Sequence, residues 1–544
     1  MRDLFRQQST ACVTALVAAL GLAACGNSAA PTDRIVGACA PGAGPQTVAG
    51  SVANGDAKQY RAIAFEVAPG TGRIEVAYGW TDNPGPPSSP LTATTLDLGL
   101  WGPDGYRQPD QFRGWSGSRQ GRLDQEQAPV SVEAGAAERG YVPGAIEPGT
   151  WYVDLGIAAV SPQGANWTVQ VECKAAGGNL PPADPVDPQH VARSQAGWFH
   201  GDFHMHGFHS NSNAPDWEGF IEQSRTANLD FLMVTEYVTG RHWQTLGAVQ
   251  RAHPDLLIWP GREVITYFGH VNTHGETPQS LEYRHGFEDI GIAEIQAGAV
   301  AADALFQVNH PTIFPGPVFQ NLCRGCEFEL GDEIDWGQVD TLEVLTGPVL
   351  ATGADVGLPI PGQTENPFLQ TAIDLWEEQL LAGHRITAVS GSDSKGVDAP
   401  EERERKGYGS SATAVFAPQL SRPALKAAIR AGHAYVRTLG ANRSPAVEFR
   451  VTTDDGQSGI YGDAVQAETA TLQTEVVGGQ GQTLRYFANG ELILTVPVTS
   501  DPFVHEQAAT RLPNEGPLGT FWRIELHNGE VRTVIGNPVF VQAP

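Results

Sequence analysis

The stretch Trp198-Phe-His-Gly-Asp-Phe-His-Met-His206 constrains this chain more than any other part of it. Its aromatic residues and Met205 predict a short, largely buried strand. Side chains on a strand alternate between two faces, so His204 and His206 point the same way, with Cα atoms about 6–7 Å apart. Two imidazoles placed like this can hold one metal ion. Two polar residues on an exposed strand face are the plainer alternative, because His-x-His alone is a weak motif.

Strands alternating with helices are predicted from about residue 197 to 440. The strand candidates are 198–206, 231–235, 256–259, 269–273, 305–308, 341–345 and 386–390. Some are separated by amphipathic helices, such as the one that presents Leu369, Ile373 and Trp376 on one face. This β-then-α order predicts a parallel, barrel-like sheet, a distorted (β/α)7 barrel with one unit fewer than the common eight.

Short alternating strands flank this central α/β region on both sides. Residues 49–176 are predicted to form a β-sandwich or jelly roll, and residues 441–544 a second β-sandwich of the immunoglobulin type. The proline-rich segment 177–196 is an extended linker. A chain of 544 residues is too long for one core, so a multi-domain protein is expected.

The first 25 residues have the features of an export signal. Arg2 and Arg6 precede an apolar run, 11–24, that is too short to span a membrane as a stable helix. The ending Leu22-Ala-Ala-Cys25 resembles the lipobox of bacterial lipoproteins, whose cysteine carries lipid. An ordinary cleaved secretory signal is the alternative. Either predicts an exported protein of the bacterial cell envelope, anchored by lipid in the first case, with residues 26–48 as a flexible tether.

Charge and cysteines narrow the environment further. A net charge of −27 argues against nucleic acid as a partner. In an oxidising compartment we expect Cys39 to pair with Cys173 and staple the ends of the first sandwich. Cys323-Arg-Gly-Cys326 would close a tight loop. That pair could instead be half of a zinc site, although no second Cys or His pair of zinc-knuckle spacing follows it.

Side chains of the kind that bind metals gather at the ends of the predicted strands, where parallel barrels have their active sites. They are four histidines and several carboxylates: His204, His206, Glu236, Glu263, His270, His310, Glu343 and Asp393. Imidazole and carboxylate together suit Zn, Mn or Fe. The sequence therefore predicts a metal site on one rim of the sheet.

The sequence motifs around these residues resemble those of the PHP (polymerase and histidinol phosphatase) superfamily. The matching series is His204-Met-His206, Pro-Gly-Arg-Glu263, Gly-His270, Asn-His310-Pro and Gly-Ser-Asp393, together with the phrases 228–237 and 428–433. The most similar branch is the carbaryl-hydrolase (CehA/McbA) type, whose members are often exported. The resemblance covers about residues 197–440 and leaves both flanking sandwiches outside it.

The resemblance implies a set of ligands for two divalent ions. The first ion would be held by His204, His206, Asp393 and a bridging Glu263. The second would share Glu263 and add two histidines, His270 and His310. Glu236 stands where the family has Asp, and we expect it to support a ligand rather than to be one.

A third metal of the family would lack its ligands here. Asn211, Tyr237 and Lys395 stand at the three positions concerned. We therefore expect two ions, Zn, Mn or Fe, with Lys395 supplying a fixed positive charge and Tyr237 a hydroxyl as catalytic residues. The alternatives are a solvated lysine in a loop and a tyrosine that only packs.

These features predict hydrolysis of a small molecule by a hydroxide that two metals activate. The bond could be an ester, carbamate, amide or phosphoester: Lys395 and Arg262 favour phosphate, whereas the carbaryl-hydrolase resemblance and the missing third metal favour a carbonyl. The alternative is a catalytically degenerate envelope lipoprotein that acts as a binding or structural module. Substrate, metal identity and oligomeric state stay open.

Overall fold

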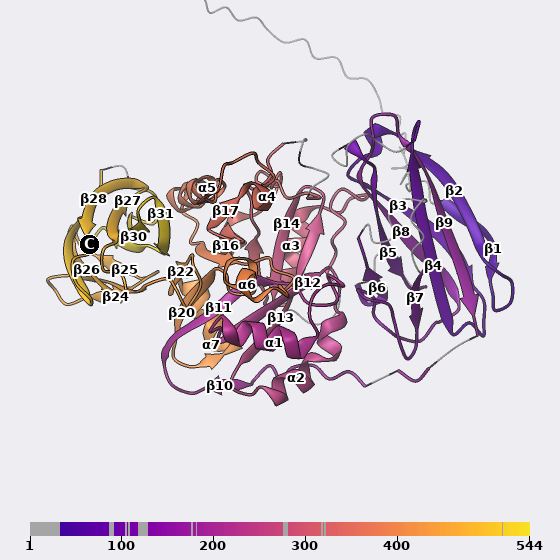
Figure 1. Ribbon diagram of the computed structural model, residues 1–544, viewed down its shortest axis with the longest axis horizontal. Helices are drawn as coiled ribbons and strands as arrows, with labels where there is room; N and C mark the ends of the chain where they lie inside the picture. Colours follow the sequence, from indigo (N-terminus) through magenta and orange to yellow (C-terminus); the bar gives the residue numbers. More distant parts are fainter. Residues whose placement is uncertain are drawn as a thin grey trace, which may run out of the picture.

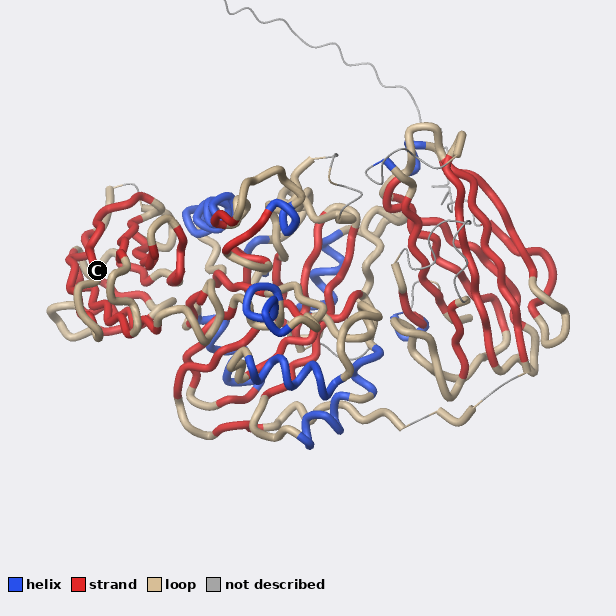
Figure 2. The backbone as a smooth tube through the Cα atoms, viewed as in Figure 1, coloured by secondary structure: helices blue, strands red, loops and turns tan. Residues whose placement is uncertain are grey.

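The computed structural model describes residues 33–85, 92–103, 106, 109–117, 129–175, 178–180, 182–275, 281–316, 319, 323–513 and 515–544. Three lobes follow one another along the chain (Figure 1). The longer helices lie in the central lobe, between two lobes built of strands (Figure 2). The predicted export signal and Cys25 lie outside the described residues. Among the residues described, no helix is long and apolar enough to cross a membrane.

The N-terminal lobe is a sandwich of two sheets (Figure 1). Their strand orders are β1-β3-β8-β5-β6 and β2-β9-β4-β7. Inward-facing side chains such as Phe65, Trp151 and Val169 are fully buried between them. The strands are β1 (Asp33–Cys39), β2 (Gln46–Val52), β3 (Gln59–Val67), β4 (Arg73–Asp82), β5 (Thr95–Trp101), β6 (Phe112–Trp115), β7 (Val130–Glu133), β8 (Gly149–Ala159) and β9 (Ala165–Lys174).

Part of the segment predicted as a tether, 26–48, belongs to this sandwich. β1 pairs in parallel with β3, and β2 pairs antiparallel with β9. Ile35 and Cys39 are buried, and a disulfide joins Cys39 to Cys173 with Cα atoms 5.4 Å apart. Glycine and alanine suggested a flexible segment, but two buried side chains and a covalent link hold β1 in the sheet.

The central lobe is built on one long, curved sheet. Its order begins β19-β16-β15-β14-β13-β12-β11-β20-β22. All seven predicted strands are present, in β11 (Gly197–Met205), β12 (Phe231–Tyr237), β13 (Leu257–Thr266), β14 (Gly269–His274), β15 (Leu305–Val308), β16 (Thr341–Thr346) and β19 (Thr387–Gly391), joined by β20 (Ala412–Ala417) and β22 (Ala434–Arg437). The longer helices around it are α1 (Trp217–Thr226), α2 (Leu246–Ala252), α3 (Ile292–Ala301), α5 (Leu369–Ala382), α6 (Pro400–Lys406) and α7 (Arg422–Ala431).

This sheet departs from the uniformly parallel (β/α)7 barrel that the sequence predicts. β14 runs antiparallel to both β13 and β15. Only Tyr267 and Phe268 connect β13 to β14, whereas a parallel crossover needs a dozen or more residues. Between the described residues at the ends of β11 and β19, one bridge joins Met205 to Ser394. The sheet therefore curls until these ends meet, without a continuous ladder between them.

The central sheet continues into the C-terminal lobe. β22 pairs with β31, with Val436 opposite Ile535, and the order goes on through β30, β27 and β28. A second sheet, β24-β23-β26-β29, packs against this continuation. The strands are β23 (Ala446–Thr452), β24 (Ser458–Ile460), β25 (Ala464–Gln466), β26 (Thr469–Val477), β27 (Thr483–Ala488), β28 (Glu491–Pro497), β29 (Phe503–Thr510), β30 (Thr520–Asn528), β31 (Val531–Gly536) and β32 (Val539–Gln542).

The N-terminal lobe is fixed to the central lobe by buried polar contacts. Asp154 on β8 accepts hydrogen bonds from the hydroxyls of Tyr106, at 2.6 Å, and Tyr283. The Arg284 guanidinium lies 4.3 Å from the Trp101 ring centroid. Burial raises the pKa of Asp154, although Arg284 and the two tyrosines act against that rise. Paired buried groups of this kind make the contact between the lobes specific.

Asn537, just after β31, joins the C-terminal lobe to the central strands. Its Oδ1 accepts from the Ala388 N–H at 2.8 Å, and its Nδ2 donates to the carbonyls of Ala388 and Ala434, both at 3.0 Å. The side chain is buried. It therefore links the backbones of β19 and β22 to the C-terminal lobe.

We expect Asn537→Leu to lower the free energy of unfolding by about 3 kcal/mol, since it removes three buried hydrogen bonds worth about 1 kcal/mol each. Urea denaturation followed by tryptophan fluorescence measures the change in the first transition. Asn166→Leu, at an exposed position of β9, is the control, with an expected change within about 0.5 kcal/mol. Equal midpoints for the two variants would contradict this role.

Candidate metal centre

Four predicted ligands from three parts of the central sheet face one point; we call them the first ligand group. The Nε2 atoms of His204 and His206 each lie 3.3 Å from Glu263 Oε2. Asp393 Oδ1 lies 3.6 Å from His204 Nε2 and 2.9 Å from His206 Nε2. β11 carries His204 and leads into His206, β13 carries Glu263, and Asp393 follows β19.

These separations fit a shared ion. Bonds of about 2.0–2.1 Å in a tetrahedron place neighbouring ligand atoms about 3.3–3.4 Å apart, near the 2.9–3.6 Å seen here. Three of the atoms that face the centre, His204 Nε2, His206 Nε2 and Glu263 Oε2, are buried and have no hydrogen-bond partner among the described residues. Buried polar atoms rarely stay unpaired, so this donor set fits a cation.

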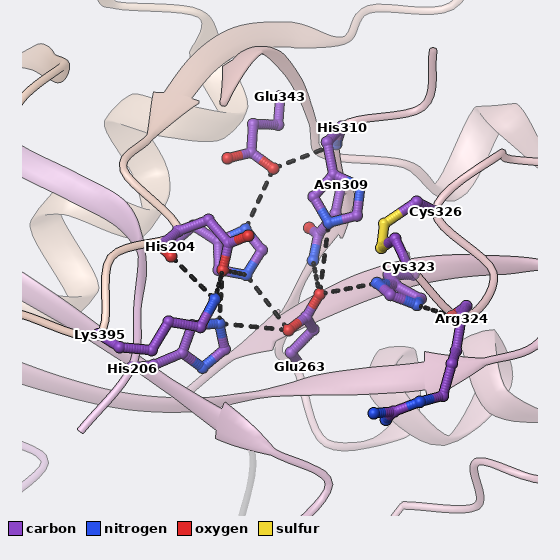
Figure 3. The surroundings of a disulfide bond; sticks show 12 residues. His204, His206, Glu263, Asn309, His310, Cys323, Arg324, Cys326, Glu343 and Lys395 are labelled. Atoms are coloured by element: carbon purple, nitrogen blue, oxygen red, sulfur yellow. Dashed lines mark hydrogen bonds and ion pairs between the residues drawn. A yellow bond between two sulfur atoms is a disulfide. The ribbon is translucent and has the colours of Figure 1, made fainter. Parts of the chain in front are cut away.

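The second ligand group shares Glu263. Its Oε1 lies 3.0 Å from His270 Nδ1 and 3.4 Å from His310 Nε2. His270 belongs to β14 and His310 follows β15. One carboxylate thus serves both groups with different oxygens, as a ligand that bridges two ions does (Figure 3).

Glu343 on β16, which the sequence did not assign, supports the first ligand group. Its Oε2 lies 3.2 Å from His204 Nδ1 and accepts from the His310 N–H at 3.1 Å. A carboxylate at Nδ1 keeps the proton there and leaves Nε2 free for a metal. The available signal was a charged residue inside the apolar run Thr341–Thr346.

Glu236 and Ser210 support the other histidine of the pair. Ser210 Oγ lies 3.2 Å from His206 Nδ1. Glu236 on β12 accepts from the N–H groups of His209, at 3.2 Å, and Ser210, at 2.7 Å. Burial raises the pKa of Glu236, against hydrogen bonds from Ser210 and the charge of His206. Glu236 therefore orders the loop after His206 and contacts neither ligand group directly.

Mutual charge holds the first ligand group together. Burial alone would lower the pKa of His204, but the carboxylates of Glu343, Glu263 and Asp393 outweigh it and hold that pKa well above its usual value. Burial alone would raise the pKa of Glu263, yet His204 and its neighbours hold it well below the usual range. The carboxyl group of Glu263 is thus ionised, as a metal ligand must be.

Asp202 on β11 is a second residue that the sequence did not single out. Its Oδ1 accepts from the N–H groups of His204, at 3.1 Å, and Ser392, at 2.9 Å, while Oδ2 accepts from Gly409 N at 2.8 Å. Burial raises the pKa of Asp202 to about 6. One carboxylate therefore ties β11 to the loop that carries Asp393.

Two ligands have left-handed backbone conformations. The φ angle is 28° at His310 and 47° at Asp393. Such angles cost about 1–2 kcal/mol in a residue other than glycine. The Asp393 N–H donates to the His204 carbonyl at 2.9 Å, which holds the turn. Strain of this kind concentrates at functional sites.

The two predicted catalytic residues lie beside the first ligand group. Lys395 Nζ donates to Asp393 Oδ1 at 2.5 Å and lies 5.5 Å from the Tyr237 ring centroid. Tyr237 packs on His206 with ring centroids 4.2 Å apart. Burial raises the pKa of Tyr237, whereas Asp393 and Tyr237 raise that of Lys395 against its burial. Both therefore keep their protons at neutral pH.

Other candidate residues have different surroundings. Arg262, considered for phosphate, is fully buried, lies 5.0 Å from the Trp243 ring centroid and donates to the Val238 carbonyl. Cys323 and Cys326 lie close enough to His270 to share an ion with it, but their sulfurs bond to each other (Figure 3).

Comparison with known proteins gives distant structural similarity. No family model and no curated protein matches the chain. A two-domain protein from Bacteroides vulgatus, containing a predicted PHP-like metal-dependent phosphoesterase, is similar with a TM-score of 0.34 and 16% identity, over 66% of this chain and 100% of that one. A protein from Bifidobacterium adolescentis described as a putative metal-dependent phosphoesterase is similar with a TM-score of 0.25 and 10% identity, over 42% of this chain and 95% of that one. Both similarities are distant, with TM-scores below 0.5.

We expect Glu343→Gln to weaken metal binding by about 10-fold or more, because a neutral amide holds the His204 proton less firmly than a carboxylate. Titration of the metal-free protein with Zn²⁺ or Mn²⁺ measures the affinity. Glu333→Gln, at an exposed position after β15, is the control. Unchanged affinity in Glu343→Gln would show that His204 needs no such support.

Proposed function

We propose that this chain is a metal-dependent hydrolase of the PHP superfamily, of the carbaryl-hydrolase type, that holds two divalent ions. One observation carries the proposal: six side chains from five separate segments converge in two groups that share Glu263. A degenerate member of the superfamily could have lost any of these ligands, whereas all six are here. The nitrogen and oxygen donors suit Zn, Mn or Fe.

The first ligand group (His204, His206, Glu263 and Asp393) and the second (Glu263, His270 and His310) would each hold a divalent ion, which would lower the pKa of a bound water and polarise the substrate oxygen. The exposure of the surrounding side chains indicates from which side a substrate can reach the two ligand groups. His204, His206 and Glu263 are almost fully buried, whereas the side chains of Asp393 and Lys395 are 29% and 27% exposed. The substrate therefore approaches past Lys395.

Lys395 and Tyr237 complete the chemistry on that side. With its pKa raised, Lys395 stays an ammonium and stabilises negative charge on the substrate rather than accepting a proton. Tyr237 stays a neutral phenol and can donate a hydrogen bond to the same charge or to the leaving group. Both roles serve a phosphorus centre or a carbonyl centre equally.

The proposed location of this reaction is the bacterial cell envelope. The lipobox-like sequence at Cys25 supports a lipoprotein of the bacterial envelope that acts on a small molecule. The disulfide between Cys39 and Cys173 is consistent with an oxidising compartment.

The deciding experiment measures metal in a soluble form lacking residues 1–25. We expect about two equivalents in the wild type and about one in His310→Ala, because only the second ligand group loses a member. His384→Ala, outside both groups, should keep two. The same preparations are tested on p-nitrophenyl phosphate, acetate and carbamate, which separate phosphoesterase from carbonyl chemistry. A wild type without bound metal, or a metal-loaded protein inactive on all three, would count against a hydrolase.

Lys395→Met should lower kcat by about 100-fold or more while leaving the metal content unchanged, since it removes a charge that faces the developing anion. Lys395→Arg should restore part of the rate. Steady-state kinetics on the best substrate of the panel measure both. If Lys395→Met instead loses metal, Lys395 serves to position Asp393 and not to stabilise charge.

A further inference from the structure

The loop Cys323-Arg-Gly-Cys326 lies against the second ligand group (Figure 3). The carbonyl oxygen of Arg324 lies 2.5 Å from His270 Nε2. A carbonyl only accepts, so this contact places the imidazole proton on Nε2. The lone pair of Nδ1 then faces Glu263, in the orientation that a metal ligand needs.

Gly325 lets this loop pack directly against the hairpin of β13 and β14, which carries Glu263 and His270. Its φ is 78°, and a Cβ at this position would lie 2.2 Å from the Thr266 carbonyl oxygen and 2.8 Å from the Tyr267 carbonyl carbon. Only glycine fits such a contact. The loop therefore packs on the turn between β13, which carries Glu263, and β14, which carries His270.

The N-terminal sandwich contacts both the Cys323–Cys326 loop and the turn between β13 and β14. Asp97 on β5 is fully buried. Its Oδ1 lies 3.6 Å from Arg324 Nη1, and its Oδ2 accepts from the Tyr267 hydroxyl at 2.9 Å. One carboxylate thus pairs with the loop and with the hairpin turn together.

The disulfide between Cys323 and Cys326 closes the loop with Cα atoms 5.4 Å apart. A cavity of about 410 Å³ adjoins it, lined in part by Cys323, Cys326, Phe314 and Glu329. Among the described residues, the loop therefore has protein on the side of His270 and this cavity on the other. Without the covalent link, the Arg324 carbonyl could move away from His270 into that space.

We propose that this loop is the positioning element of His270, so that the oxidation state of the Cys323–Cys326 pair sets the occupancy of the second metal site. The inference rests on the proposed two-metal function. On reduction by a dithiol, the S–S bond breaks, the cysteine sulfurs take up two electrons and two protons, and the dithiol becomes a disulfide. His270 then loses its fixed acceptor, while His204, His206 and Asp393 still surround Glu263.

The test titrates the purified full chain with Zn²⁺ in three states: oxidised, reduced with a dithiol that is removed under nitrogen, and reoxidised. We expect two sites in the oxidised protein. Reduction should weaken one of them by about 10–100-fold and leave the other within about threefold, and reoxidation should restore both. The double variant Cys323→Ser/Cys326→Ser should behave like the reduced protein.

A second variant keeps the disulfide and moves the loop. Gly325→Ala should weaken the same single site, whereas Gly331→Ala, which has no atom within 4 Å of the added Cβ, should not. Circular dichroism and retention of the first site distinguish this effect from unfolding.

Three results would overturn the inference. They are two sites of unchanged affinity after reduction, parallel weakening of both sites, and a retained second site whose Co²⁺ form shows thiolate absorption, because the cysteines would then be ligands. An oxidised wild type that binds no metal would instead count against the proposed function itself.

Discussion

The central constraint of this structure is the burial of one carboxylate among four imidazoles. Glu263 is almost completely removed from water, where an unpaired charge would cost several kcal/mol. His204 and His206 face one of its oxygens, and His270 and His310 the other. The strands that supply these residues must therefore keep fixed positions relative to β13. The curvature of the sheet and the turns after β15 and β19 serve that requirement.

The local pattern of apolar residues predicted most of the central strands, and the resemblance of short sequence segments to the PHP superfamily implied the set of residues that meet at Glu263. What escaped prediction depends on contacts far apart in the chain. Glu343 lies 139 residues from His204, and Asp202 lies 190 from Ser392. The reversed direction of β14 follows from a two-residue turn, and β1 belongs to the first sandwich because it pairs with β3 and buries Ile35. The periodicity of apolar residues in the sequence predicts neither the direction of β14 nor the pairing of β1.

The N-terminal sandwich borders the candidate metal centre, although the resemblance to the PHP superfamily does not extend to this sandwich. Trp115 lies 6.4 Å from Tyr237 between ring centroids, and Arg139 donates to the Ser210 carbonyl at 2.7 Å. Asp97 reaches the opposite side through Arg324. This lobe therefore contacts segments next to both ligand groups, and its sequence can influence the shape of the site without contributing a ligand.

The shared sheet of the central and C-terminal lobes has a practical consequence. β22 gives its backbone groups to β31, so a fragment ending near residue 440 would expose a row of unpaired N–H and C=O groups along β22. An open edge of this kind recruits strands from other molecules. Isolated expression of the N-terminal and central lobes without residues 441–544 would therefore favour aggregation, and the C-terminal lobe covers that edge in the full chain.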